Sequence, residues 1–331
     1  MPWKGEKNPY KIWLSEIILQ QTKVEQGLSY YLKFIKAYPT IDKLAAAKED
    51  AVFKMWEGLG YYSRCRNLLA TAKNITENYA GVFPKDYESL LSLKGVGPYT
   101  AAAIASFAYN LPHAVVDGNV YRVLARYFGI NTAIDSIEGI AYFKKLANDL
   151  LDKNNASGYN QAIMDFGATI CKPKLPFCAS CVFKNTCAAF KLNKVDTLPV
   201  KETKIIKKKR YFYFVLAKYG NQIYVRKRTE KDIWQNLWEF ILIELHTKIE
   251  VDIFLKSEKF TELIPSTAVL QNYSPFYKQQ LTHQTIEGSF IVVQLKKPLA
   301  KTNYELVHIK DLQKLAFPRF ITNYFEKNPT I

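Results

Sequence analysis

The 331-residue sequence is short of acidic residues and of long apolar runs. It has 30 Asp and Glu residues against 46 Lys and Arg residues, a formal net charge of +16. No apolar run approaches the roughly 18 residues that a membrane span requires, and the N-terminal MPWKGEKNPYK has no signal-peptide core. These absences argue against a membrane or secreted protein. They favour a cytoplasmic protein with a polyanionic partner, with a merely basic soluble protein as the alternative.

Cysteine is also scarce, and its distribution is uneven. Four of the five cysteines fall within 17 residues with the spacing C-x6-C-x2-C-x5-C, and Cys65 stands apart; the four are Cys171, Cys178, Cys181 and Cys187. A secreted disulfide framework would spread its cysteines and pair them evenly. Four thiolates this close favour a metal centre, either zinc or an iron–sulfur cluster. Zinc ribbons usually have two CxxC pairs, and this segment has one.

The first half of the sequence has the periodicity of helices and few strand signals. Asn8 precedes Pro9 and an apolar-periodic segment, which is typical of a capped helix start. Similar segments continue to about residue 190, so we expect residues 1–190 to form an all-α domain. Residues 191–210 carry eight Lys and Arg residues against two acidic ones. They predict a basic linker, either a solvated tether or a strap that follows a nucleic-acid backbone.

The remainder, residues 211–331, has a different pattern. The segment YFYFVLAKYGNQIYVRKR alternates apolar and polar residues around Gly220–Asn221, which predicts a β-hairpin. We expect a further strand at GSFIVVQLKK and helices at IKDLQKL and FITNYFEK. This part of the chain is therefore expected to be an α+β domain.

A glycine-rich loop, LKGVGPYTAAA at residues 93–103, lies between two expected helices. Gly95 and Gly97 admit backbone angles that other residues avoid, and Pro98 suits the first position of the next helix. Backbone N–H groups at such a hairpin form an anion site, and in a basic all-α domain the expected anion is a DNA phosphate. A turn without a ligand is the alternative.

Two carboxylates have surroundings that differ. Glu16 lies among apolar residues in WLSEIILQQT, where desolvation would raise the pKa of its side chain and suit it to act as a general acid. Asp117 in AVVDGNVYRVLAR occupies an expected helix N-cap. One protonated and one ionised carboxyl are what cleavage of a glycosidic bond requires. The alternatives are an exposed glutamate and a purely structural cap.

These motifs together resemble the endonuclease III superfamily of helix-hairpin-helix glycosylases. Within it, WLSEIILQQT, GLGYYSRCRNL, VDGNVYRVLAR and NQAIMDFGA resemble the MutY family of adenine DNA glycosylases. The resemblance implies an all-α helix-hairpin-helix catalytic domain over residues 1–190, with a [4Fe–4S] cluster held by the four cysteines of the loop at residues 171–187. A NUDIX-like α+β domain that recognises 8-oxoguanine would then follow the linker, over residues 211–331. Relatives usually begin with an extra stretch before the Pro-Trp pair, which stands here at residues 2–3.

The resemblance also implies roles for individual residues. Glu16 would protonate adenine and assist water attack, Asp117 would stabilise the sugar cation, and Asn119 would orient the reacting groups. Tyr99 would line the pocket, and it stands where glycosylases that also nick the strand carry a Schiff-base lysine. The implied contacts with DNA are Gln161 at the adenine edge, Leu19, Gln21 and Tyr61 around the opposing lesion, and Gly95, Val96 and Gly97 at a phosphate.

The C-terminal half carries weaker motifs of the same family. IWQNLWEF matches its tryptophan-rich turn, and LTHQTIEGSF stands where the family has a Phe-Ser-His loop. Here Leu281 replaces the aromatic residue, whereas Thr282 keeps a hydroxyl group and His283 is retained. We find no REx2EE cluster, so this domain should bind rather than hydrolyse.

The expected function is base-excision repair by a monofunctional adenine DNA glycosylase. Its partner would be double-stranded DNA with adenine opposite 8-oxoguanine or guanine, bound by a monomer in the cytoplasm, or at the nucleoid if the source is bacterial. A glycosylase/lyase for oxidised pyrimidines and a non-catalytic DNA-binding protein are the alternatives.

Overall fold

The computed structural model describes residues 2–202, 206–300 and 302–328, and the chain divides into two compact units. Unit 1 comprises residues 1–46 and 66–204, and unit 2 comprises residues 47–65 and 205–331. A segment from the first half of the chain therefore belongs to the unit that the C-terminal half builds. Residues 203–205 of the expected linker lie outside the described residues, and the domain boundaries at 190 and 211 stay a prediction.

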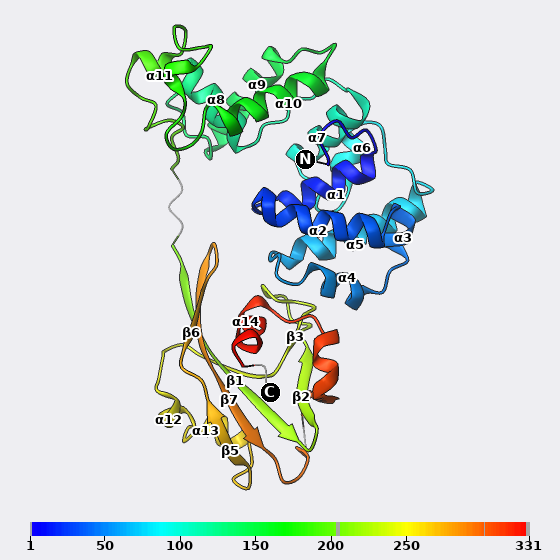
Figure 1. The fold of residues 1–331 in the computed structure, drawn as a ribbon, viewed down its shortest axis with the longest axis vertical. Coiled ribbons are helices and arrows are strands. Elements are labelled where there is room, and N and C mark those ends of the chain that lie inside the picture. The colour runs from blue at the N-terminus through cyan, green and yellow to red at the C-terminus, as the bar shows by residue number, and fades with distance from the viewer. Residues whose placement is uncertain (1, 203–205, 301, 329–331) are drawn as a thin grey trace. The chain divides into compact units, whose positions relative to one another are not determined.

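Unit 1 is helical, as the periodicity predicts, and its described residues contain no strand (Figure 1). It contains α1 (Pro9–Leu19), α2 (Val24–Ala37), α3 (Ile41–Ala45), α6 (Tyr87–Ser92), α7 (Pro98–Tyr109), α8 (Gly118–Phe128), α9 (Ile137–Leu150), α10 (Ala156–Thr169) and α11 (Ala188–Lys191), with most of α5 (Tyr62–Asn78) and a 3-10 helix at Cys178–Ser180. None of the described helices is long and apolar enough to cross a membrane.

Local sequence signals set the starts of the helices that carry the candidate site. The side chain of Asn8 accepts hydrogen bonds from the backbone of Tyr10 and Lys11, with Pro9 at the first position of α1. Pro98 opens α7 in the same way. Residues 100–106 of α7 are all buried, and their small side chains allow close packing against α1 and α6. The alanine-rich helix is thus the centre of this part of unit 1.

Unit 2 is built around a mixed eight-stranded sheet. Its strands are β1 (Lys208–Tyr219), β2 (Gln222–Lys227), β3 (Trp238–Glu239), β4 (Ile241–Leu245), β5 (Val269–Tyr273), β6 (Tyr277–Gln280), β7 (Gln284–Gln294) and β8 (Glu305–His308). The main order is β3-β2-β1-β7-β5, with β4 on β1, β6 on β7 and β8 on β2. Helices α12 (Val251–Phe254), α13 (Glu258–Leu263) and α14 (Arg319–Lys327) accompany the sheet, with α4 (Glu49–Trp56) from residues 47–65.

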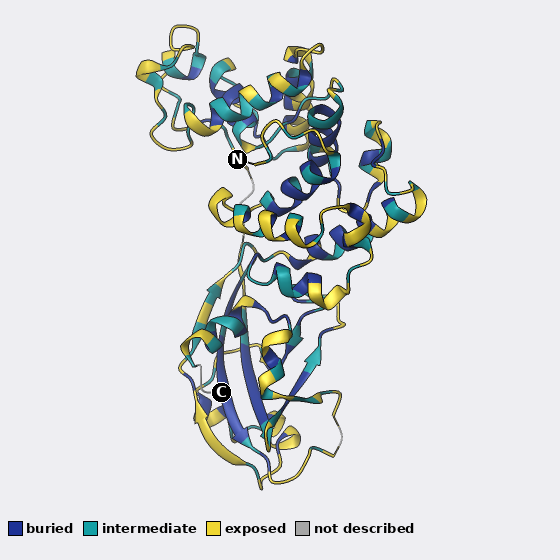
Figure 2. Cartoon of the chain, turned by 45° about the vertical axis from the view of Figure 1, so that its right-hand side comes forward, coloured by how far each residue is buried: buried dark blue, intermediate teal, exposed yellow. Residues whose placement is uncertain are grey.

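The expected hairpin forms, with β1 and β2 paired antiparallel around Gly220–Asn221. The segment IKDLQK is a 3-10 helix at Ile309–Lys314 rather than an α-helix. Strand β1 also pairs in parallel with β7 from Lys208 to Lys218, which places it inside the sheet, and residues 212–217 are all buried. The two central strands are accordingly dark blue in Figure 2. A Cβ atom at Gly288 of β7 would come within 2.5 Å of the carbonyl oxygen of Phe212, which excludes a larger residue there.

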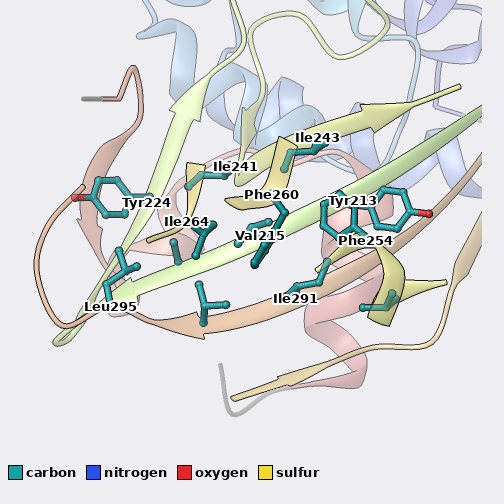
Figure 3. Packing of buried hydrophobic residues seen from close by; sticks show 13 residues of the cluster. Tyr213, Val215, Tyr224, Ile241, Ile243, Phe254, Phe260, Ile264, Ile291 and Leu295 are labelled. Carbon is teal, nitrogen blue, oxygen red and sulfur yellow. The ribbon is translucent and has the colours of Figure 1, made fainter. Parts of the chain in front are cut away.

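Both faces of this sheet are covered. On one face Tyr213, Val215 and Ile291 pack with Phe254 of α12 and Phe260 of α13 (Figure 3). On the other face, aromatic rings from β1 and β7 pack against α14; these are Phe214 and Phe290, whose centroids lie 6.0 and 5.7 Å from that of Phe320. Because successive residues of a strand point to opposite faces, β1 supplies both cores.

Polar contacts hold helix α4 within unit 2. The carboxylate of Glu49 accepts hydrogen bonds from Lys227 and from Asn236, at 3.3 and 2.6 Å. Lys54 donates to the carbonyl of Leu315 at 2.9 Å. Glu57, just after the helix, accepts a hydrogen bond from the backbone N–H of Phe317 at 2.8 Å. These contacts join residues more than 170 positions apart in the chain, which no local sequence signal predicts.

Candidate active site and cysteine loop

A cavity of about 280 Å³ in unit 1 brings four of the predicted site residues together, and three of them are ionisable. Glu16 comes from α1, Tyr99 from the first turn of α7, and Asp117 from the position before α8. The cavity is lined by Glu16, Leu19, Gln20, Tyr99, Val116 and Asp117. Residues from three separate elements therefore converge on one small polar site.

The environment of Glu16 suits a general acid. Burial raises the pKa of its carboxyl group to about 7, and the negative charge of Asp117 adds to this. A hydrogen bond from the Tyr99 hydroxyl acts in the opposite direction. Burial and the neighbouring Glu16 raise the pKa of Tyr99 well above its usual value, so its hydroxyl stays protonated and donates. Near neutral pH, Glu16 can therefore carry a transferable proton.

Asp117 has the opposite environment, because several donors surround its carboxylate. Its Oδ1 atom accepts hydrogen bonds from the backbone N–H groups of Asn119 and Val120, both at 2.8 Å. The side-chain amide of Asn119 donates to Oδ2 at 2.7 Å. Together with the N-terminus of α8, these donors stabilise the negative charge. The N-cap predicted from the sequence is confirmed.

Arg122 connects this carboxylate to the cysteine loop. One of its terminal nitrogens donates to Asn119 Oδ1 at 2.8 Å and to the carbonyl of Gly167 at 2.7 Å. Its Nε atom donates to the carbonyl of Cys171 at 2.7 Å. The guanidinium group is nearly fully buried, so its several donors need these partners. Arg122 fixes the amide of Asn119 with its NH₂ group toward Asp117.

The glycine-rich loop joins α6 to α7 as a hairpin, as predicted. Gly95 has φ +77°, and a Cβ atom there would lie 2.6 Å from Cβ of Asn67. The expectation for Gly97 was wrong in one respect, because its φ of −88° is open to any residue. A Cβ atom at Gly97 would meet nothing within 4 Å in the protein. Only Gly95 is required by the fold, whereas Gly97 leaves open space beside the start of α7.

The remaining predicted residues of unit 1 lie outside the cavity lining, except for Leu19. Gln21 is exposed just beyond α1, with φ +53°. Gln161 lies on α10, where its amide Nε2 donates to Asp165 at 3.0 Å. Helix α10 packs against α7 and α8, the helices next to Tyr99 and Asp117. Val96, in the hairpin, is buried. The roles predicted for these residues stay predictions.

Three other predicted residues belong to unit 2. The hydroxyl groups of Tyr61 and Thr282 form a short hydrogen bond. Tyr61 has φ +47°, an uncommon conformation for an aromatic residue, and its ring lies 5.6 Å from the guanidinium of Arg64. Thr282 and the exposed His283 occupy the turn between β6 and β7. Two positions separated by 221 residues thus meet on one face of unit 2.

The four clustered cysteines line a second cavity, of about 490 Å³. All four are free thiols and half-buried, and the rest of the lining is mostly apolar. Arg126 donates to Cys171 Sγ at 3.6 Å and to the carbonyl of Lys172 at 2.7 Å. Across the described residues, no group of three or more His, Cys, Asp or Glu side chains is arranged to hold a single metal ion. Four soft thiol donors around one apolar cavity fit an iron–sulfur cluster by the chemistry of the donor set.

Comparisons with known proteins agree with this geometry. Residues 14–149 match the model of the HhH-GPD superfamily of base excision DNA repair proteins, and residues 212–327 match a NUDIX domain. An adenine DNA glycosylase from Buchnera aphidicola subsp. Baizongia pistaciae is 41% identical over 72% of this chain and 68% of the relative. Another, from Buchnera aphidicola subsp. Acyrthosiphon pisum, is 31% identical over 98% of this chain and 92% of the relative.

The chain belongs to the adenine DNA glycosylase family. The human adenine DNA glycosylase is 39% identical over 57% of this chain and 36% of its own length. Among solved structures, a thermostable thymine-DNA glycosylase has a TM-score of 0.54 at 29% identity, covering 58% of this chain and 88% of that one. An endonuclease III–DNA complex has a TM-score of 0.51 at 23% identity, which supports the fold. The family and the two-part fold class inferred from the sequence are confirmed.

The structure also identifies residues that the sequence analysis missed. Gln20 and Val116 line the cavity with Glu16 and Asp117, and Gln20 donates to the hydroxyl of Thr100 at 3.3 Å. Both missed residues are adjacent to motif residues, but whether their side chains face the cavity depends on how α1, α7 and the segment before α8 pack. Nothing in the sequence indicated that Arg122 contacts the site, because a single arginine in an amphipathic helix is usually a surface residue.

Proposed function

We propose that this chain is a monofunctional adenine DNA glycosylase that removes adenine opposite 8-oxoguanine or guanine in double-stranded DNA. The observation that carries the proposal is the pairing of Glu16 with Asp117 in one cavity, because the two carboxyls have opposite environments. Cleavage of an N-glycosidic bond requires the same two groups as cleavage of other glycosidic bonds. An acid protonates the leaving group, and an anion stabilises the sugar cation. The target base would first be flipped out of the duplex.

In this mechanism Glu16 protonates the leaving adenine and then assists the attack of water. Asp117, held by Asn119 and the N-terminus of α8, stabilises the oxocarbenium-like sugar. Tyr99 donates a hydrogen bond to Glu16 and lines the pocket. The N–C bond breaks, adenine leaves with the proton from Glu16, and water supplies the hydroxyl group of the abasic site.

The residue at position 99 supports a monofunctional enzyme. A tyrosine cannot form a Schiff base with the sugar, so strand cleavage should require added alkali. The hairpin with its open side at Gly97 supports phosphate binding by backbone N–H groups. The net charge of +16 favours a polyanion without specifying its sequence.

Unit 2 supports recognition of the base opposite adenine. Tyr61 and Thr282 offer an aromatic ring and a hydroxyl group at one place, and His283 is exposed beside them. Such groups can stack on a base and bond to its edge. The REx2EE cluster of a hydrolase does not occur in the sequence, which favours binding over hydrolysis.

We also propose that Cys171, Cys178, Cys181 and Cys187 hold a [4Fe–4S] cluster. When bound, the cluster ties the cysteine loop together through four thiolates. Arg122 and Arg126 contact the backbone of this loop from α8, so the order of the loop bears on the position of Asn119. The cluster takes no part in the steps above.

Cysteine substitution tests the cluster. Cys171→Ser should lose most of the bound iron and the yellow-brown absorbance of the purified protein, because one of four ligands is removed. Cys65→Ser is the matched control, since Cys65 is a buried cysteine of unit 2 outside the four-cysteine segment, and its substitution should leave the iron content unchanged. A colourless wild-type protein that contains zinc would contradict the assignment.

The activity itself is tested with labelled duplexes that carry adenine opposite 8-oxoguanine, guanine or thymine. We expect cleavage at adenine opposite 8-oxoguanine only after alkali, and no adduct trapped by borohydride. A borohydride-trapped adduct would favour the glycosylase/lyase alternative. Tight binding without base release would favour a non-catalytic DNA-binding protein.

A further inference from the structure

A chain of polar contacts joins helix α10 to the segment before α1, and none of its residues takes part in the proposed catalytic steps. Gln161 and Asp165 lie one turn apart, and Gln161 Nε2 donates to Asp165 Oδ1 at 3.0 Å. The ammonium group of Lys4, from the segment before α1, contacts both carboxylate oxygens of Asp165 at 2.8 Å. Segments 161 positions apart in the chain therefore meet at one carboxylate.

This arrangement determines which way the Gln161 amide faces. An ionised carboxylate only accepts hydrogen bonds, so only the NH₂ group of an amide can face it. The ammonium group of Lys4 contacts both carboxylate oxygens and holds this side chain in place. The carbonyl Oε1 of Gln161 is consequently the end that points away from Asp165. Without Asp165, an amide could present either its donor or its acceptor.

Helix α10 lies close to the reacting groups. Asn160, next to Gln161, is buried and accepts a hydrogen bond from the backbone of Val115 at 3.0 Å. Met164, one turn further, packs against the same small cluster as Tyr99. Asn160 and Met164 thus place α10 beside the residues around Tyr99. Gln161 lies outside the cavity lining, next to Asn160 in the chain, and its contact with the adenine edge is the one predicted from the family resemblance.

We propose that Asp165, fixed by Lys4, is a positioning residue that makes Gln161 a hydrogen-bond acceptor and so selects a base with an exocyclic amino group. The inference rests on the proposed function, and it identifies the feature of adenine that is read. Adenine carries an amino donor at C6, hypoxanthine carries a carbonyl acceptor there, and unsubstituted purine carries neither. A fixed acceptor at Gln161 Oε1 favours adenine, whose amino group donates to it, and disfavours hypoxanthine, whose carbonyl group faces it with a second acceptor.

The test compares single-turnover excision of adenine, hypoxanthine and purine, each opposite 8-oxoguanine. For Asp165→Asn we expect the ratio of adenine to purine excision to fall about three- to tenfold. The effect should be modest because Asp165 and Lys4 are 41% and 46% exposed. Excision of purine and affinity for the duplex should stay unchanged. Asp165→Glu, which keeps a carboxylate, should restore part of the ratio.

Asp149→Asn is the matched control, because it removes another exposed Lys–Asp pair of unit 1, between Lys145 and Asp149 on α9. It should leave the ratio unchanged. If Asp165→Asn folds poorly, Lys4→Met should shift the same ratio in the same direction by releasing Asp165.

An unchanged ratio in both Asp165→Asn and Lys4→Met would overturn the inference. An equal loss on all three bases would also overturn it, because that result indicates a general structural role. Failure of the wild-type protein to release adenine would contradict the proposed function and this inference together. Normal adenine release with an unchanged ratio would contradict the inference alone.

Discussion

The cavity of unit 1 and the Tyr61–Thr282 contact of unit 2 are both polar, but water reaches them to different extents. In the cavity, burial is the main reason that the pKa of Glu16 rises to about 7. In unit 2, Tyr61 is 40% exposed, and its contact with Thr282 is a hydroxyl–hydroxyl bond. Burial changes the chemistry of a group, whereas an exposed contact mainly adds interactions whose strength is limited by competition with water.

This comparison predicts that substitutions in the cavity act on the rate and those at the exposed contact act on recognition. Glu16→Gln should have the largest effect, because it removes the general acid while keeping the shape of the side chain. We expect excision to fall by about 10²- to 10⁴-fold with duplex binding retained. Glu25→Gln, at an exposed glutamate of α2, is the matched control. Near-normal turnover in Glu16→Gln would remove Glu16 from the acid role.

The burial of Glu16 also predicts a pH dependence of excision. Because Glu16 acts when protonated, excision should decline as pH rises through about 7, by tenfold per pH unit at the limit. Tyr99→Phe removes the hydrogen bond that lowers the pKa of Glu16. The alkaline limb should therefore move to higher pH in Tyr99→Phe. A pH–rate profile for single-turnover excision measures the shift. If the alkaline decline occurs at the same pH in Tyr99→Phe and in wild type, the Tyr99–Glu16 hydrogen bond does not influence the pKa of Glu16.

The cost of burying Glu16 should appear in the free energy of unfolding. Its pKa is about 7 in the folded protein and about 4.3 in an unfolded chain. Between these values the folded state binds more protons, so stability decreases as pH rises. Glu16→Gln should remove the part of this slope that is due to Glu16. Relative to wild type, the variant's free energy of unfolding should therefore be roughly 3 kcal/mol higher at pH 8 than the same comparison gives at pH 4. Urea unfolding at several pH values measures it, and parallel curves for wild type and variant would show that Glu16 does not titrate as expected.

The smallest effects are expected at the exposed contact. Tyr61→Phe and Thr282→Val each remove one partly solvated hydrogen bond, so the preference for 8-oxoguanine over guanine should change by only about two- to fivefold. Tyr273→Phe, which removes the hydroxyl of a similarly exposed tyrosine in unit 2, should have no effect. A loss of several orders of magnitude in the chemical step would show that this contact is not separate from catalysis.

Local signals accounted for the chemistry-bearing positions. Asn8 and Asp117 cap their helices because short polar side chains bond to nearby backbone N–H groups, which involves residues two or three positions away. The hairpin at Gly220–Asn221 is equally local. The four cysteines are close in sequence, and loop closure brings them to one cavity at little entropic cost.

The partners of those positions could not be read in the same way. Arg122 reaches Gly167 of α10 and the cysteine loop only after α8 and α10 have packed together. The parallel pairing of β1 with β7 joins residues about 76 positions apart and buries both faces of a strand whose sequence predicts one solvent-facing side. Helix α4 gave no sign that it belongs with the C-terminal sheet.

Residue types and short separations were enough to identify the family, the helical and mixed halves, the two carboxylates and the cysteine spacing. Packing between distant segments brings Glu16, Tyr99 and Asp117 to one cavity, Lys4 to Asp165, and Tyr61 to Thr282. Those contacts depend on side-chain direction and on packing between distant segments, which periodicity and spacing do not encode.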